Sequence, residues 1–180
     1  QPLSIAVTGS TGFVGSNIAA ILAGRGHRVI GLSRREVSDA PWEIRSVDFD
    51  SVESLTESLA GVDAVVHCAI ANDFNRLLAD RDYAYDSFVG MTSRVSRAAA
   101  ATGTQMVYIS TDWVMDGEGH REPESNPGNA INFYGYLKAL GEQAAVGQAI
   151  DARGVGGLLL HQHLLLHLPH CLHRLLLRQL

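Results

Sequence analysis

The sequence is poor in cysteine and has no excess of positive charge. Its 180 residues contain two cysteines, Cys68 and Cys171, far apart and in no Cys-x-x-Cys pair. This spacing excludes a disulfide framework and a zinc ribbon, and a reducing, cytoplasmic setting is the expectation. The formal net charge of -5 leaves no basic footprint for nucleic acid or for an anionic membrane surface.

Two kinds of hydrophobic segment are also missing. The first residues enter an apolar strand pattern without the basic and apolar regions of a secretory signal. No stretch of about 20 apolar residues exists, because the leucine-rich end of the chain is broken by His, Arg and Pro169. We therefore expect neither a secretory signal nor a membrane span. The length and the 46% hydrophobic content fit one α/β domain with its own core.

Short apolar runs alternate with stretches of helical periodicity as far as residue 146. Strands are predicted at 3–8, 28–33, 44–47, 62–68 and 105–110, and helices at 13–25, 51–59, 85–101 and 134–146. This alternation implies right-handed crossovers and a parallel sheet with helices on both faces. The predicted fold class is α/β, with a Rossmann-like doubly wound parallel sheet. The polar loop 112–131 is long for a compact domain, as functional loops are.

A glycine-rich turn follows the first predicted strand and opens the first helix. It reads Thr8-Gly9-Ser10-Thr11-Gly12-Phe13-Val14-Gly15. The first glycine permits a tight turn, the second a close approach to a pyrophosphate, and the third close packing of the helix. Backbone N–H groups and the helix dipole then favour an anion. The strand–turn–helix context favours a dinucleotide site over a plain glycine turn, with contacts from Gly9, Thr11, Gly12, Phe13, Val14 and Gly15.

The end of the second strand bears on which dinucleotide is bound. An acidic residue there would bind the ribose hydroxyls of NAD, but the sequence reads Gly31-Leu32-Ser33-Arg34-Arg35. A guanidinium makes charge-assisted bonds to a 2′-phosphate, so NADP(H) is favoured over NAD(H), with Ser33 and Arg34 as contacts. A pair of solvated surface arginines is the alternative. Asp48 is a candidate acceptor for the adenine amino group or, equally, a helix cap.

A tyrosine and a lysine supply the parts for carbonyl reduction. Tyr134 and Lys138 lie one helical turn apart, and Thr111 follows the fifth strand, at the edge where doubly wound sheets build their sites. The lysine charge would lower the tyrosine pKa from about 10, and Thr111 would polarise the carbonyl. The candidate catalytic residues are Thr111, Tyr134 and Lys138, and the last two would also contact the cofactor. A core Tyr beside an exposed Lys on an amphipathic helix is the alternative.

These motifs resemble those of the extended short-chain dehydrogenase/reductases. The segment Ile109-Ser110-Thr111-Asp112-Trp113-Val114-Met115-Asp116-Gly117 resembles the S-T-D-Y-V-F-D-G of dTDP-4-dehydrorhamnose reductases. Tyr134-Gly135-x-x-Lys138-x-x-Gly141-Glu142 resembles their Y-G-x-x-K-x-x-G-E. The resemblance implies an NADP-dependent reductase of a nucleotide-linked 4-keto sugar, with Tyr134 as proton donor. It also implies cofactor contacts at Gly9, Gly12, Gly15, Asp48, Ala69 and Ile70, and substrate contacts at Asp112 and Trp113.

Several positions depart from the pattern of that family. Trp113 stands where the family has Tyr, Met115 replaces Phe, and Phe88 occupies a helix position where Asn is frequent. The run His67-Cys68-Ala69-Ile70 is a loose version of N-x-A-A. The resemblance therefore supports the fold and the cofactor more firmly than the identity of the sugar.

Two other functions fit the same resemblance. One is a non-catalytic NADP-binding regulatory subunit, like the β subunit of methionine adenosyltransferase, although the complete set of Thr111, Tyr134 and Lys138 favours an enzyme. The other is an NAD-dependent sugar epimerase or dehydratase. Dehydratases of the family read T-D-E, whereas Asp112 is followed here by Trp113. The expected partner is a small-molecule substrate, and the sequence leaves a homodimer open.

The amino-acid composition and hydrophobic pattern of the sequence change after about Ile150. Residues 154–180 are rich in Leu, with five histidines and Cys171 interspersed, and show no strand-like alternation. We therefore divide the chain into an NAD(P)-binding domain at 1–150 and an atypical Leu/His-rich tail at 151–180. The sheet is expected to end before the substrate-binding subdomain that the resemblance implies.

The tail itself is interpreted as a shifted reading frame or a degenerate end. Metal binding by its histidines is an alternative that no nearby carboxylate supports, so no metal site is predicted. A poorly packed Leu-rich helix is the simpler expectation. Because specificity for the sugar would come from a region that cannot be read here, we expect weak NADP(H) binding and little activity.

Overall fold

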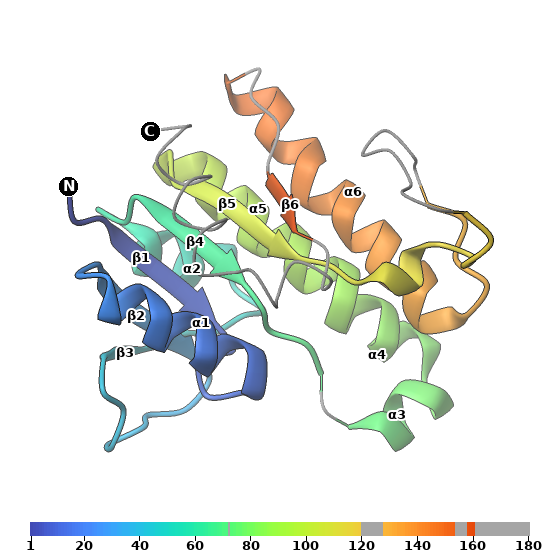
Figure 1. Cartoon of the computed structure of the whole chain (residues 1–180), viewed down its shortest axis with the longest axis horizontal. Coiled ribbons are helices and arrows are strands. Elements are labelled where there is room, and N and C mark those ends of the chain that lie inside the picture. The colour runs from blue at the N-terminus through green and yellow to red at the C-terminus, as the bar shows by residue number, and fades with distance from the viewer. Residues whose placement is uncertain (72, 120–127, 154–157, 161–180) are drawn as a thin grey trace.

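One parallel sheet organises the chain. The computed structural model describes residues 1–71, 73–119, 128–153 and 158–160 (Figure 1). The strands are β1 (Ser4–Thr8), β2 (Arg28–Ser33), β3 (Glu43–Ser46), β4 (Ala64–His67), β5 (Gln105–Ile109) and β6 (Leu158–Leu160). They pair in parallel in the order β3-β2-β1-β4-β5-β6. The predicted Rossmann-like doubly wound sheet is confirmed.

Helices cover both faces of this sheet. The α-helices are α1 (Phe13–Gly24), α2 (Val52–Leu59), α3 (Phe74–Ala79), α4 (Arg81–Tyr85), α5 (Met91–Thr102) and α6 (Phe133–Arg153). A π-helical turn, η1 (Asp86–Gly90), joins α4 to α5, and a 3-10 turn, η2 (Asp112–Val114), follows β5. Figure 1 shows α1 in front of the sheet and α2 and α5 behind it.

The apolar run of β1 is explained by burial on both faces. Ile5 and Val7 pack with Ile18 and Leu22 of α1, whereas Ala6 packs in a second cluster beneath α2, α5 and α6. Successive side chains of a strand point to opposite faces, so a parallel strand with two covered faces needs apolar residues at every position. The same reason accounts for the continuous apolar residues of β4.

The long helix predicted at 85–101 is interrupted by η1. The Asp86 carboxylate accepts bonds from the Arg94 guanidinium at 2.7 and 3.0 Å. A Cβ on Gly90 would collide with this carboxylate. The glycine at position 90 therefore leaves the space in which Asp86 pairs with Arg94. A second element missed from the sequence is α3, whose N-cap Asp73 accepts the Arg76 N–H at 3.0 Å.

The end of the sheet differs from the sequence prediction. Leu158–Leu160 form β6 and pair with Val107–Ile109 of β5, so the view that no strand follows residue 150 is wrong at these positions. A run of leucines can serve as a short parallel strand because such strands need no alternation. Helix α6 also extends beyond its predicted end at 146. The predictions for 161–180, including the histidines and Cys171, lie outside the described residues.

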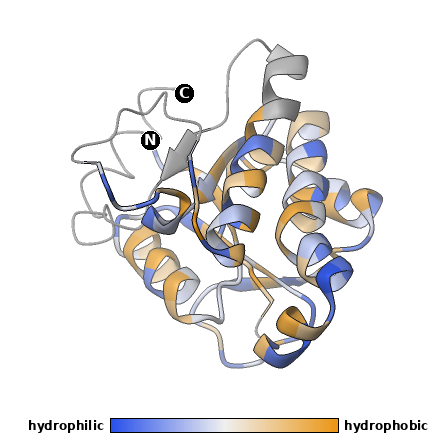
Figure 2. Cartoon of the chain, turned by 90° about the vertical axis from the view of Figure 1, so that its right-hand side faces the viewer, coloured by the Kyte–Doolittle hydropathy of each residue, from blue (hydrophilic) through white to orange (hydrophobic). Residues whose placement is uncertain are grey.

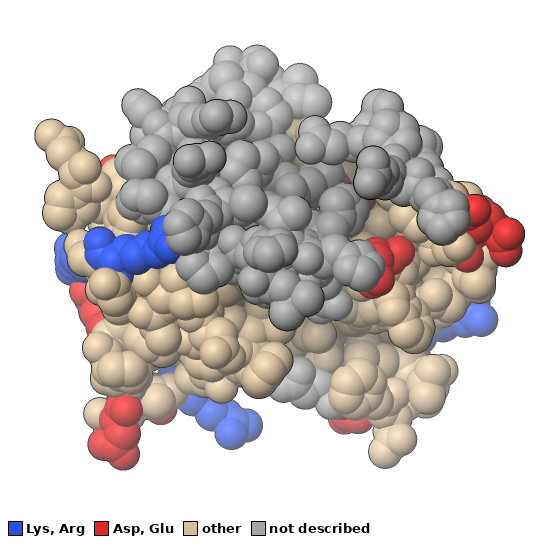
Figure 3. All heavy atoms as spheres, viewed as in Figure 1, with Lys and Arg blue, Asp and Glu red and all other residues tan. Residues whose placement is uncertain are grey.

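Surface and helix patterns match a layered α/β domain. The helices in Figure 2 carry hydrophobic and hydrophilic residues on different sides. On the face in Figure 3, acidic and basic side chains are scattered rather than gathered by sign. No described helix combines the length and the apolar character that a membrane crossing requires.

Candidate cofactor and catalytic site

The glycine turn joins β1 to α1 through close backbone contacts. Gly9 has a φ of 67°, in the left-handed region, and its carbonyl oxygen accepts the Gly12 N–H at 2.9 Å. A Cβ on Gly15 would collide with the same oxygen, so α1 packs against the turn because residue 15 has no side chain. The first and third glycines thus serve the geometry for which they were predicted, and the contact of Gly12 with a pyrophosphate stays a prediction.

The amino end of α1 fits an anion. Gly12 is the N-cap, no side chain caps the helix, and the first turn holds no acidic residue. Thr11 and Phe13 are exposed, while Val14 packs partly against the core. Backbone N–H groups and the positive end of the helix dipole therefore face solvent at this turn, which is the environment that a pyrophosphate requires.

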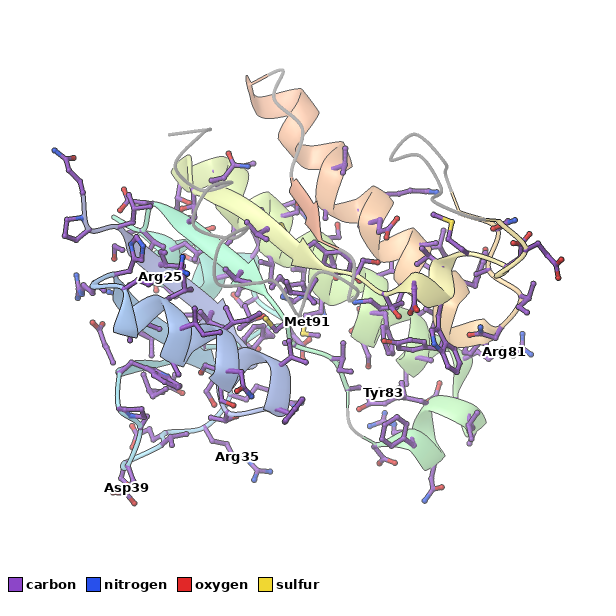
Figure 4. The ribbon with its side chains drawn as sticks, in the orientation of Figure 1. Arg25, Arg35, Asp39, Arg81, Tyr83 and Met91 are labelled. Atoms are coloured by element: carbon purple, nitrogen blue, oxygen red, sulfur yellow. The ribbon has the colours of Figure 1, made fainter. Side chains whose placement is uncertain are left out.

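Two arginines follow the end of β2. The Ser33 hydroxyl oxygen accepts the Arg35 N–H at 3.2 Å. The side chains of Arg34 and Arg35 are exposed, and no ion pair joins either one to another residue that the structure describes. Figure 4 shows Arg35 pointing away from the ribbon. Both guanidinium groups are accessible to a phosphate, and both also fit the alternative of solvated surface arginines.

Asp48 lies exposed after β3. Its carboxylate accepts the Asp50 N–H at 2.9 Å. Helix α2 is capped instead by Ser51, whose hydroxyl accepts the Ser54 N–H at 3.1 Å. Asp48 is therefore not the N-cap of this helix, and its contact with an adenine stays a prediction.

The residues that leave β4 lie against the glycine turn. The N–H groups of Cys68 and Ala69 both donate to the Thr8 hydroxyl oxygen, each at 3.1 Å. A Cβ on Gly9 would lie 3.1 Å from the Ala69 backbone. The structure thus brings Ala69 beside the turn, and the partly exposed Ile70 follows it. Contacts of Ala69 and Ile70 with a dinucleotide stay a prediction.

Thr111, Tyr134 and Lys138 come together at the carboxyl end of β5. Thr111 is buried directly after the strand, and its side chain lies beside that of Tyr134 in the first turn of α6. One turn further, the buried Lys138 Nζ donates to the Ile109 carbonyl oxygen at 2.6 Å. It also lies 4.2 Å from the centre of the Tyr108 ring. The alternative of an exposed lysine beside a core tyrosine is wrong.

The pKa of Tyr134 is raised above its ordinary value of 10. Partial burial is the main cause, the Asp112 carboxylate adds to it, and the bond to Thr111 acts in the opposite direction. The sequence predicted a pKa lowered by Lys138, which is wrong for this structure because the ammonium points to Ile109. Burial lowers the pKa of Lys138 itself to about 8. Near neutral pH Tyr134 therefore carries its proton, as a proton donor requires.

Aromatic side chains flank Tyr134 on two sides. The exposed Trp113 ring lies edge-on to the Tyr134 ring, with 6.1 Å between the ring centres. The buried ring of Phe88, in η1, has its centre 5.7 Å from that of Tyr134. The Trp113 N–H donates to the Thr111 hydroxyl oxygen at 3.3 Å, and that hydroxyl donates to the Asp112 carboxylate at 3.2 Å. Trp113 and Phe88, both departures from the family pattern, thus shape the immediate surroundings of the phenol.

Two polar contacts near the site were not predicted. The Ser110 hydroxyl donates to the Glu142 carboxylate on α6. His67 is buried between the hydroxyls of Thr8 and Thr92. The sequence contained all these residues within or beside its motifs, but their contacts depend on how closely α6 and α5 approach the sheet. Spacing along the chain does not give that distance.

Metal-ligating side chains are dispersed in the region that the structure covers. Within it, no group of three or more His, Cys, Asp or Glu side chains is placed to hold a metal ion.

Comparison with known proteins identifies the family. The sequence model of the NAD dependent epimerase/dehydratase family matches residues 5–157. The chain belongs to this family. The resemblance inferred from the motifs is thereby confirmed, and relatives include sugar-nucleotide reductases.

Three relatives illustrate the range of the NAD dependent epimerase/dehydratase family around this chain. Methionine adenosyltransferase 2 subunit beta from Rattus norvegicus is 26% identical over 148 residues, 82% of this chain and 44% of that protein. A dTDP-4-dehydrorhamnose reductase from Mycolicibacterium smegmatis is 26% identical over 153 residues, 82% of this chain and 43% of that protein. The structure of UDP-glucose 4-epimerase from Brucella ovis in complex with NAD matches with a TM-score of 0.74 at 25% identity. It covers 88% of this chain and 51% of the epimerase, so the chain spans about half the length of these relatives.

Proposed function

We propose that this chain is the cofactor-binding part of an NADP(H)-dependent reductase of a nucleotide-linked 4-keto sugar. The placement of Thr111 beside Tyr134, with Lys138 one turn further along α6, at the edge of the sheet that also carries the glycine turn, is the observation that carries the proposal. The match to a dTDP-4-dehydrorhamnose reductase supports the same reaction class.

The residues around the glycine turn fit a dinucleotide. The uncapped amino end of α1 favours a pyrophosphate, and Arg34 and Arg35 favour a 2′-phosphate on the adenosine ribose. Ala69 and Ile70 would line the same site, and Lys138 would donate to the nicotinamide ribose. When bound, the nicotinamide supplies the hydride.

The proton for the reduced oxygen would come from Tyr134. Its raised pKa keeps the phenol protonated, and the Thr111 hydroxyl would donate to the same carbonyl oxygen if it turned from the Asp112 carboxylate. An epimerase must first oxidise its substrate, which needs the phenolate as a base, and a raised pKa disfavours that form.

A regulatory NADP-binding subunit is the second candidate function. The chain is as similar to methionine adenosyltransferase 2 subunit beta as to the reductase, at 26% identity in each case. A subunit of this kind would bind the cofactor without consuming it, so binding and turnover must be measured separately.

Fluorescence titration of the purified chain with NADPH and NADH tests the cofactor. We expect both to bind weakly, NADPH more tightly, with energy transfer from protein aromatic residues to the reduced nicotinamide. Absence of binding to either dinucleotide would overturn the proposal.

Slow turnover separates the two functions. NADPH absorbance should fall over hours in the presence of a dTDP-linked 4-keto sugar, and Tyr134→Phe should stop this decay while leaving NADPH binding within about twofold. Binding without any decay in the wild-type chain favours the regulatory subunit. Conversion of a nucleotide sugar with no net change in NADPH favours an epimerase.

A further inference from the structure

A buried histidine joins three strands beneath the proposed cofactor site. His67 ends β4, is 1% exposed, and is paired across the sheet with Thr8 of β1 and Tyr108 of β5. Its Nδ1 lies 2.7 Å from the Thr8 hydroxyl oxygen and its Nε2 lies 3.2 Å from the Thr92 hydroxyl oxygen. The ring therefore spans from the glycine turn to helix α5.

The contacts around Thr8 determine which nitrogen of His67 carries the proton. A threonine hydroxyl has one proton and two lone pairs. Both lone pairs of the Thr8 oxygen are taken by the N–H groups of Cys68 and Ala69. Its proton must therefore be donated to Nδ1 of His67, which leaves the ring proton on Nε2.

The far side of the ring agrees with this assignment. The Thr92 hydroxyl donates its proton to the Phe88 carbonyl oxygen, so it can only accept from its other partners. Its partner on the ring side is Nε2 of His67, at 3.2 Å. Each hydroxyl and each ring nitrogen of the network thus has a defined donor or acceptor role.

A charged imidazole has no place in this network. A proton on Nδ1 would face a Thr8 oxygen whose lone pairs are both engaged. Burial and the nearby Lys138 ammonium also lower the pKa of His67, to about 3. The other titratable groups packed around it are Cys68 and Tyr108, both with pKa values raised by burial and thus uncharged near neutral pH.

We propose that His67 is a positioning residue for the dinucleotide site: its neutral, Nε2-protonated imidazole orients the Thr8 hydroxyl as the acceptor that fixes Cys68 and Ala69 against the glycine turn. Through Thr92 and the Phe88 carbonyl it ties the same turn to η1, whose Phe88 ring packs against Tyr134. The proposal rests on the proposed function only in naming the ligand of the site that His67 supports.

Nitrogen-15 NMR of the chain labelled at histidine tests the protonation state without any substitution. The expected spectrum shows a neutral ring protonated at Nε2, unchanged from pH 8 to pH 5. A ring protonated at Nδ1, or one that titrates near the ordinary histidine pKa of about 6.5, overturns the proposal.

Two variants of His67 test positioning. His67→Asn keeps a side-chain oxygen that can accept from Thr8, whereas His67→Leu has similar bulk and no acceptor. We expect the NADPH dissociation constant to rise about tenfold in His67→Leu and in Thr8→Val, and to stay within about threefold in His67→Asn. Hydrogen exchange of the Cys68 and Ala69 amides should become faster in His67→Leu and Thr8→Val but not in His67→Asn.

The outcomes separate this inference from the proposed function. If the wild-type chain binds no dinucleotide, the proposed function fails, while the imidazole spectrum and the Cys68 and Ala69 exchange rates still decide the network. If the chain binds NADPH and a folded His67→Leu binds it equally well, the positioning role fails and the cofactor assignment stands. A His67→Asn variant as weak as His67→Leu also contradicts the role assigned to the acceptor.

Discussion

The backbone of Trp113 passes so close to Gly135 that a Cβ on residue 135 would collide with the Trp113 carbonyl oxygen. Trp113 belongs to η2 and Gly135 to the first turn of α6, and each is close in sequence to one of the neighbouring side chains of Thr111 and Tyr134. The separation of the two proposed catalytic hydroxyls is therefore set by a contact that only glycine permits at position 135.

Gly135→Ala should destabilise the fold and part Thr111 from Tyr134. Pushing α6 away from η2 costs about 1–3 kcal/mol as an overpacking effect, which outweighs the gain of up to about 1 kcal/mol in helix propensity. Urea denaturation should show a lower free energy of unfolding with an unchanged m-value.

Gly24→Ala is the matched control for this substitution. Gly24 also lies in a helix, at the end of α1, and a Cβ there would meet nothing within 4 Å. We expect its free energy of unfolding to stay the same or to rise by up to about 1 kcal/mol. Equal destabilisation by the two alanines would show that the Trp113 contact is not the cause.

Acid should destabilise the protein through His67 before its carboxylates titrate. The pKa of His67 is about 3 in the folded chain and 6.5 ordinarily. Below pH 6.5 the unfolded chain therefore binds a proton that the folded chain does not bind. Stability should fall by about 2 kcal/mol between pH 7 and pH 5 from this group. Chemical denaturation at both pH values, compared with His67→Asn, isolates the effect, because the asparagine variant should lack that share of the loss.

Alkali should at first stabilise the protein through Lys138. Its pKa is lowered from 10.5 to about 8, so above pH 8 the folded chain releases a proton that the unfolded chain still holds. The free energy of unfolding should rise by about 1 kcal/mol from pH 8 to pH 9. Above pH 9 Cys68, with a pKa raised to about 12, acts in the opposite direction. A Lys138→Met variant that shows the same rise would assign it to another group.

Arg34→Asp should change the preference between the two dinucleotides. Loss of a charge-assisted bond, with a carboxylate now beside the 2′-phosphate, should weaken NADPH binding at least about tenfold and leave NADH binding within about twofold. Arg25→Ser is the control, because Arg25 lies at the carboxyl end of α1, away from the glycine turn (Figure 4). Equal weakening of NADH and NADPH would exclude a specific contact with the 2′-phosphate.

The sequence was most informative where the structure depends on neighbouring residues. The turn from Gly9 to Gly15 and the single helical turn between Tyr134 and Lys138 are local features, and both were predicted correctly. The parallel, doubly wound sheet also follows from the alternation of strands and helices.

Features that depend on contacts between distant segments were missed. The π-helical turn at η1 is accompanied by the bond of Asp86 to Arg94, which helical periodicity does not reveal. The direction of the Tyr134 pKa shift was wrong because spacing placed Lys138 on the same helix face but could not show that Ile109 takes its ammonium. The short strand β6 was missed because its three leucines carry no alternation.

Residues 135, 138 and 141 follow one another at intervals of three along α6, so Lys138 lies between two glycines, of which Gly135 packs against η2 and Gly141 against Tyr108 of β5. Its ammonium is already held by Ile109, whose carbonyl belongs to β5 backbone and cannot swing aside. Any ligand that engages this lysine exchanges one acceptor for another, and only the difference between the two contributes to affinity. Lys138 would therefore bind molecules with two well-placed oxygens, such as a ribose diol, more tightly than molecules that offer a single weak acceptor.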